Sequence, residues 1–290
     1  MTAAVQQGWW PSWQLFGDAI LVGLALGAVL PVLGVVLVLR QQMFVTAAIG
    51  QAANLGIATI IWLGAGATHG LAHGTDSGET GALLGGLGFA VAATVLALRA
   101  LSRSASTLEA SSVWVFVAGG SGAMVLLADV PHGLAEVQRL MLSSLLCVGP
   151  GDVYVVGGFA LALVLAIVWW PRRLALWAMD PQTAAAYGTP AWRCDLVVGA
   201  FGGALLGWSI YTAGLVFTFA CAMLPVLAAR ELAGSLRGVL GLSPALGALG
   251  VAAGYAVAHR CDLPAGQTSA VVLVAAVVVA RIVGFTSRRR

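Results

Sequence analysis

Two carboxamide side chains stand out in an apolar stretch near the start of the chain. Gln51 and Asn54 lie three residues apart within residues 44–64, which are otherwise mostly apolar. On a helix this spacing places both side chains on one face. Because an amide inside a bilayer needs a polar partner, the pair either lines a path for a polar substrate or hydrogen-bonds to a neighbouring helix. The sequence leaves both interpretations open.

Four residues with metal-binding side chains follow in a glycine-rich segment. His69, His73, Asp76 and Glu79 fall within eleven residues, between two apolar stretches. Imidazole and carboxylate groups are ligands that zinc and manganese accept. The segment either captures a metal ion outside the membrane or is a solvated turn whose polar residues only keep it in water.

A third polar group surrounds residues 133–146. Asp129, His132, Glu136 and Asp152 lie beside or within this segment, and its leucine, valine and methionine residues recur at helical spacing. The pattern predicts an amphipathic helix along the membrane surface.

Residues 119–122 read Gly-Gly-Ser-Gly, which matches the G-x-S-G pattern of rhomboid-type intramembrane proteases. Ser121 would be the nucleophile and His259 the base of such an enzyme. Ser121 falls in the middle of one apolar stretch, however, and His259 falls near the end of another. Runs of small residues in membrane helices usually serve close packing, which is the favoured interpretation here.

The overall composition is that of a membrane protein. Hydrophobic residues make up 60% of the 290 positions, charged residues make up 9%, and the mean hydropathy is +0.97. A soluble domain carries about 25% charged residues, so most of this surface must face lipid. The chain also has no lysine, which excludes the lysine of a P-loop and leaves ATP hydrolysis to a separate chain.

The apolar runs predict an all-α, polytopic bundle of nine membrane-spanning helices, or eight if the two between Asp195 and Arg230 form one. We expect a single membrane domain over 18–287, an interfacial segment at 1–17 with three tryptophans, and a basic tail at 288–290. The predicted spans are 18–39, 44–64, 81–98, 111–128, 153–170, 195–212, 215–230, 240–258 and 268–287.

Arginine placement predicts the orientation of these spans. All fourteen basic residues are arginines, and the nine-span topology puts twelve on one side and only Arg139 and Arg260 on the other. Cytoplasmic loops accumulate positive charge, so the N-terminus is expected outside and the C-terminus inside. A secondary transporter would instead show repeated halves with interrupted helices, and no clear repeat is seen.

Five short motifs occur in order between residues 30 and 285. They are residues 30–40 with Met43-Phe44, residues 50–56, the trio Asp180, Ala184 and Gly188, residues 223–230, and residues 262–266. Together they resemble the permease family of ABC importers for zinc, manganese and iron. The resemblance implies a subunit of the bacterial inner membrane that imports a divalent metal ion. The chain would bind no cofactor of its own, because ATP would be hydrolysed on a partner.

The resemblance also implies partners and contact residues. It implies a homodimer, two ATPase subunits and an extracytoplasmic metal-binding protein in a lipid bilayer, and no nucleic acid. The binding protein would dock near His132, Glu136 and Arg139. A coupling helix would contact the ATPase through residues Ala229, Arg230, Glu231, Leu232 and Ser235.

One departure from the family concerns the metal path. The family's second helix offers an Asp and a His four residues apart, whereas the corresponding residues here are Ala47 and Gln51. A methyl group and an amide suit a divalent transition metal far less well. Either Gln51, Asn54, His69, His73 and Asp76 handle the metal, or the cargo differs.

Overall fold

The computed structural model describes residues 9–40, 43–67, 84–93, 95, 105–128, 148–169, 171–186 and 191–287. Within these ranges the chain is helical apart from short turns, so the all-α prediction is confirmed there. The helices are α1 (Trp9–Leu39), α2 (Met43–Ala67), α4 (Ala105–Leu127), α6 (Pro150–Trp169), α7 (Pro171–Met179), α8 (Pro181–Ala186), α9 (Ala191–Ala213), α10 (Leu215–Leu232), α11 (Leu236–Cys261) and α12 (Ala265–Ser287).

Seven of these helices are long and apolar enough to cross a membrane, namely α1, α2, α6, α9, α10, α11 and α12. The other two predicted spans fall on shorter apolar helices, Leu84–Ala93 and Ser112–Leu127. Helix α1 begins at Trp9, so it includes much of the predicted interfacial segment, and its apolar span begins at Gly17. The count of nine crossings and the orientation stay predictions.

The break between α9 and α10 falls at Gly214. This residue has φ 86° and ψ 162°, a backbone conformation that is essentially restricted to glycine. On either side of it the hydroxyls of Ser209 and Thr218 lie 2.7 Å apart. The long apolar stretch therefore forms two helices, as the nine-span interpretation requires.

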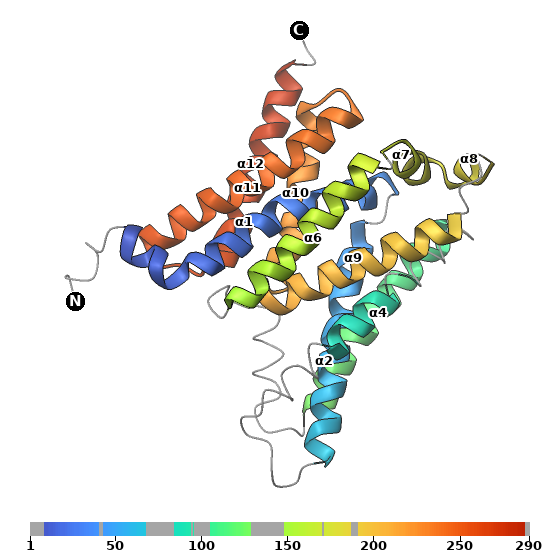
Figure 1. The fold of residues 1–290 in the computed structure, drawn as a ribbon, viewed down its shortest axis with the longest axis vertical. Coiled ribbons are helices and arrows are strands. Elements are labelled where there is room, and N and C mark those ends of the chain that lie inside the picture. Colours follow the sequence, from blue (N-terminus) through green and yellow to red (C-terminus); the bar gives the residue numbers. More distant parts are fainter. Residues whose placement is uncertain are drawn as a thin grey trace.

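Helix α1 packs against α10 and α11 through close backbone approaches. A Cβ added at Gly34 would lie 1.8 Å from the carbonyl oxygen of Ala222, and one added at Gly247 would lie 2.0 Å from that of Gly27. Small residues at such crossings let membrane helices gain van der Waals contact where no hydrophobic effect drives them together. Figure 1 shows α1, α10, α11 and α12 together on one side of the bundle.

Helices α2 and α4 form a second packed pair, which lies at the lower right of Figure 1. The rings of Phe44 and Phe116 meet across it, with centroids 5.4 Å apart. Helix α9 joins the pair to the rest of the bundle, because it contacts both α2 and α10.

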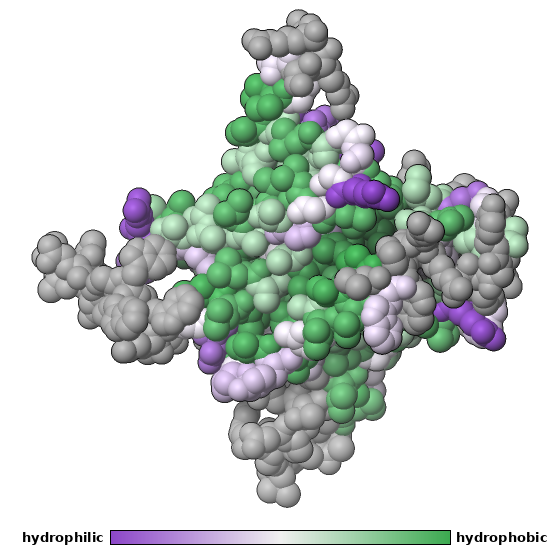
Figure 2. Space-filling view, turned by 45° about the horizontal axis from the view of Figure 1, so that its top comes forward, coloured by the Kyte–Doolittle hydropathy of each residue, from purple (hydrophilic) through white to green (hydrophobic). Residues whose placement is uncertain are grey.

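The outer surface is rich in apolar side chains. Trp114, Leu161 and Val271 are 77%, 61% and 68% exposed, respectively. Figure 2 shows a largely hydrophobic face, with hydrophilic residues toward its edges. Such a surface would be a liability in water and is what lipid-facing helices present.

Helices α7 and α8 are too short to cross a membrane and lie together at the right-hand side of Figure 1. Each begins with a proline, the residue preferred at the first helical position. Asp180 caps α8, since its carboxylate accepts hydrogen bonds from the Thr183 backbone N–H, at 3.1 Å, and from the Thr183 hydroxyl.

Candidate functional site

The two amides of α2 are buried. Gln51 is 4% exposed and Asn54 is 2% exposed. The Asn54 Nδ2 donates to the Gln51 Oε1 at 3.4 Å, a long hydrogen bond, and among the described residues the Asn54 Oδ1 has no hydrogen-bond partner. The buried hydroxyl of Thr46 on the same helix also has none there. Helix α2 therefore carries buried polar groups that the described part of the chain leaves partly unsatisfied.

Helix α4 fits against Gln51 through two glycines. A Cβ added at Gly119 would lie 2.7 Å from the Gln51 carbonyl oxygen, and one added at Gly120 would lie 3.1 Å from its Oε1. The glycine run of residues 119–122 thus serves helix packing, as the sequence favoured. It also brings Gln51 close to the α4 backbone.

The structure separates the two residues of the protease alternative. Ser121 is exposed on α4, which packs against α2, and His259 is exposed at the end of α11, which packs against α1, α10 and α12. Figure 1 shows α4 and α11 on opposite sides of the bundle. The pair does not form a catalytic site.

The other predicted metal ligands and docking residues lie outside the described residues. These are His69, His73 and Asp76 of the glycine-rich segment, and His132, Glu136 and Arg139 of the surface segment. Within the described ranges, no group of three or more His, Cys, Asp or Glu side chains could hold a metal ion. The roles of these six residues stay predictions.

The predicted coupling segment is not a separate helix, which corrects the expectation from the sequence. Ala229, Arg230, Glu231 and Leu232 form the last turn of α10, and a three-residue turn leads directly into α11. Ser235 caps α11, because its hydroxyl accepts a hydrogen bond from the Gly238 N–H at 3.2 Å. Helix α10 continues through Arg230 and Glu231 to Leu232, which leaves no room for another helix before α11.

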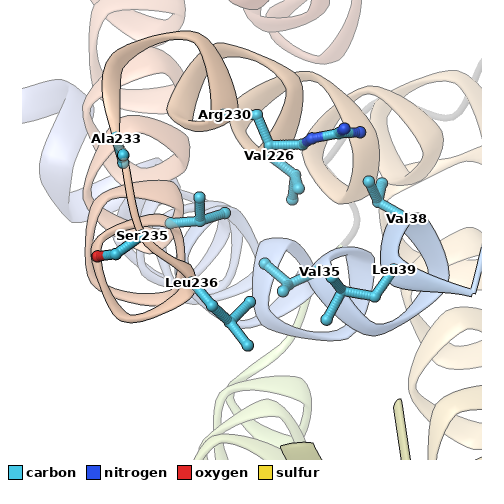
Figure 3. A pocket seen from close by; sticks show the side chains of 10 residues that line it. Val35, Val38, Leu39, Val226, Arg230, Ala233, Ser235 and Leu236 are labelled. Carbon is cyan, nitrogen blue, oxygen red and sulfur yellow. The ribbon is translucent and has the colours of Figure 1, made fainter. Parts of the chain in front are cut away.

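This turn borders a pocket of about 240 Å³ beside the end of α1. Val35, Val38 and Leu39 of α1 form one wall, and Val226 of α10 lies opposite. Figure 3 shows the Arg230 side chain reaching across the pocket toward Val38. The end of α1 and the α10–α11 turn therefore lie at the same end of the bundle.

A buried charged cluster lies on the other side of the α1 end. The Arg40 Nη1 and the Trp177 Nε1 both donate to the Asp195 Oδ1, at 2.9 and 3.0 Å. The Arg40 guanidinium carbon also lies 4.2 Å from the centre of the Trp177 ring. Arg40 follows α1, Trp177 lies in α7 and Asp195 lies in the first turns of α9, so three segments meet here.

A small apolar core surrounds this cluster. Trp177, Ala178 and Ala184 are buried, and Leu39 of α1 and Val198 of α9 pack against them. Leu39 also lines the pocket beside Arg230. Helices α7 and α8 are thus attached to the bundle by a core of their own, separate from the main one.

The model of the ABC 3 transport family matches residues 12–284 of this sequence, which is nearly the whole chain. The chain belongs to the ABC 3 transport family. It is a multi-pass protein of the bacterial inner membrane and the membrane-spanning component of an ABC transporter. The family match confirms the resemblance seen in the sequence motifs, and the secondary-transporter alternative is not favoured.

One curated protein resembles this chain in sequence, and two solved structures resemble it in fold. The manganese transport system membrane protein MntC of Halalkalibacterium halodurans is 25% identical over 277 residues, covering 95% of this chain and 87% of that protein. The structure of PsaBC from Streptococcus pneumoniae in complex with Fab matches with a TM-score of 0.73 and 18% identity, over 93% of both chains. A second structure, described as an ABC transporter in an inward-facing conformation, matches with a TM-score of 0.65 and 18% identity over 94% of this chain.

Sequence reasoning missed the Arg40–Trp177–Asp195 cluster of this ABC 3 chain. In the sequence Arg40 enters only the orientation and the motif of residues 30–40, Asp195 marks only the start of a span, and Trp177 has no assigned role. Two opposite charges at the ends of apolar stretches were a usable signal, because such charges need partners near a bilayer. Nothing in one sequence says, however, that residues 155 positions apart form the pair.

Proposed function

We propose that this chain is the permease subunit of an importer that carries a divalent transition metal ion into the cytoplasm, with manganese the first candidate. The observation that supports this most is the 25% identity, over 95% of the chain, to a manganese transport system membrane protein. Zinc and iron are the alternatives within the same chemistry.

The proposed assembly has two copies of this chain, two ATPase subunits and an extracytoplasmic metal-binding protein. Ala47, Gln51 and Asn54 share one face of α2 by their spacing, and Ala47 is partly exposed whereas the amides are buried. We propose that this face borders the path, and that the amides, of which Gln51 is packed against α4, become accessible to the ion during the transport cycle. The unpaired Asn54 Oδ1 would be an oxygen ligand for a passing cation, weak enough to release it.

The family's usual carboxylate and imidazole are replaced at this point by Ala47 and Gln51, so the path would hold the ion by neutral groups. Selectivity would then rest on the binding protein and on the outer residues His69, His73 and Asp76. This division of roles follows from charge: a neutral oxygen attracts a divalent cation less strongly than a carboxylate does.

We propose that the ATPase contacts helices α7 and α8 together with the α10–α11 turn. The predicted contact residues Ala229, Arg230, Glu231, Leu232 and Ser235 lie at the same end of the bundle as α7. Unlike the turn, α7 and α8 are short helices, and α7 has exposed apolar side chains at Leu176 and Met179 that a partner could cover. A rigid helix pair can transmit a displacement, as alternating access requires.

The test is metal transport by the complete complex. The permease, its ATPase and its binding protein are reconstituted in lipid vesicles, and ATP hydrolysis and ion uptake are measured with manganese(II), zinc(II) and iron(II). The binding protein is loaded with one ion at a time. We expect one of the three ions to stimulate ATP hydrolysis and to be transported from the side of the membrane that holds the binding protein to the side that holds the ATPase.

The control is the same complex with an ATPase subunit whose catalytic residue is removed, which should bind metal-loaded protein but accumulate nothing. A complex that hydrolyses ATP but responds to none of the three ions would show that the cargo is not a divalent transition metal. Uptake that persists with the inactive ATPase would contradict the ABC mechanism.

A further inference from the structure

We propose that Arg40, Trp177 and Asp195 form a mechanical joint that ties α7 and α8 to α1 and α9, so that a displacement of the short helices moves both spans. The inference rests on the proposed function, because it assumes that the ATPase acts on α7 and α8. The three residues are positioning residues, since none touches the transported ion.

The geometry of the Asp195 carboxylate supports a joint. A single oxygen, Oδ1, accepts from both the Arg40 Nη1 and the Trp177 Nε1, so neither donor can move far without losing the shared acceptor. The guanidinium also lies over the indole ring at 4.2 Å. Each of the three side chains therefore contacts the other two, and each belongs to a different segment of the chain.

Burial makes the joint stiff. The side chains of Arg40 and Asp195 are both 2% exposed, and Trp177 is fully buried. Water cannot replace the lost partner if the contacts part, so an intermediate separation is unfavourable and the segments move together. An exposed ion pair, by contrast, could open and close freely.

The attachment is also local. A small apolar core is formed by Trp177, Ala178 and Ala184 of α7 and α8. Residues of α1 and α9, such as Val36 and Val198, pack against this core. A push on α7 or α8 is thus delivered to these two spans and to α6, which also packs against α7. Helix α9 in turn packs against α2, which carries Gln51 and Asn54.

Among the described residues the buried Arg40 Nη2 has no hydrogen-bond partner, so the guanidinium depends on the Asp195 carboxylate and the Trp177 ring. Losing either contact is therefore costly, which again favours movement of the three segments as one body.

The experiment measures the number of ATP molecules hydrolysed per ion transported, in the reconstituted complex. The mildest variant is Trp177→Phe, which keeps an aromatic ring near Arg40, removes the indole donor and leaves a small cavity in place of the larger ring. Arg40→Met removes the charge, and Arg40→Met/Asp195→Leu removes the pair without leaving a buried charge. The matched control is Arg193→Met, because Arg193 is an exposed arginine of α9, 5.3 Å from the Trp192 ring.

We expect the joint variants to raise the ATP-to-ion ratio by about threefold or more, the size expected when a contact that couples two sites is lost. Arg193→Met should leave the ratio unchanged. Backbone amide exchange measured by mass spectrometry should speed up in residues 171–186 of Trp177→Phe, while α11 stays protected.

A purely structural role would lower hydrolysis, transport and the amount of folded complex in proportion, with the ratio unchanged, and that result would overturn the joint. Unchanged amide exchange in residues 171–186 of Trp177→Phe would overturn it as well. If the unsubstituted complex transports no metal, the proposed function fails. The amide-exchange measurement still decides whether the cluster holds α7 and α8.

Discussion

The backbone of Gly119 on α4 lies directly against the backbone of Gln51 on α2. A Cβ at Gly119 would come within 2.7 Å of the Gln51 carbonyl oxygen and carbonyl carbon. Real Cβ atoms do not approach backbone that closely, so only glycine permits this crossing. The contact fixes how deeply the Gln51 amide sits between the two helices.

Gly119→Ala is expected to destabilise the protein, because the α2 backbone, unlike a flexible side chain, cannot move aside. Overpacking of this kind costs about 1–3 kcal/mol. The measurement is the temperature at which the purified protein loses its monodisperse peak in detergent. Gly157→Ala on α6 is the matched control, since a Cβ there meets nothing within 4 Å. Equal shifts for the two variants would contradict the close α2–α4 crossing.

Asn54→Leu is expected to lower metal uptake by the reconstituted complex about tenfold or more, if the amide lines the path. The variant removes the unpaired Oδ1 and the hydrogen bond to Gln51. Its matched control is Thr59→Val on the same helix, whose hydroxyl only donates to the Leu55 carbonyl, at 2.7 Å. If Asn54→Leu inserts normally and still takes up metal, the amides do not line the path and serve only as hydrogen-bonding groups between helices.

Most of the fold could be predicted from the sequence, because lipid imposes a simple rule. Every backbone polar group must be satisfied within its own segment, so each apolar run of sufficient length becomes a helix. Residues 195–230 show where that rule weakens, since apolarity alone cannot place a break. The deciding feature is Gly214, whose backbone conformation belongs to glycine.

The candidate site was less predictable, because it depends on contacts between distant segments. The motif of Asp180 and Ala184 was recognised, but its physical basis appears only in the structure. Asp180 caps α8, and Ala184 is buried against Trp177. The prediction of a separate coupling helix around residues 229–235 was wrong for a similar reason. A charged interruption between two apolar stretches can be a helix end and a turn as readily as a separate helix.

Gly214→Ala should destabilise the α9–α10 connection, because an L residue is strained at φ 86° and ψ 162°. The cost of holding a residue in such a region is about 1–3 kcal/mol. Thermal stability in detergent measures it, with Gly151→Ala on α6 as the control, since that position has open space. A stability equal to that of the control would mean that α9 and α10 join in a conformation open to other residues.

Asp195→Leu is expected to be among the most destabilising single substitutions, because it leaves the buried Arg40 guanidinium without a counter-charge. Removing one partner of a buried ion pair costs about 3–5 kcal/mol, whereas replacing both by apolar residues is often neutral. The double variant Arg40→Met/Asp195→Leu should therefore be more stable than Asp195→Leu alone. If each substitution only removed contacts, the double variant would instead be the less stable of the two.

Arg281→Met provides the comparison, because Arg281 is 73% exposed and lies 3.8 Å from Glu231. Such surface pairs contribute about 0–1 kcal/mol. Thermal denaturation of the three variants and the unsubstituted chain gives the order of their stabilities. If Asp195→Leu unfolds no earlier than Arg281→Met, the Arg40–Asp195 pair is not buried as described and cannot act as a stiff joint.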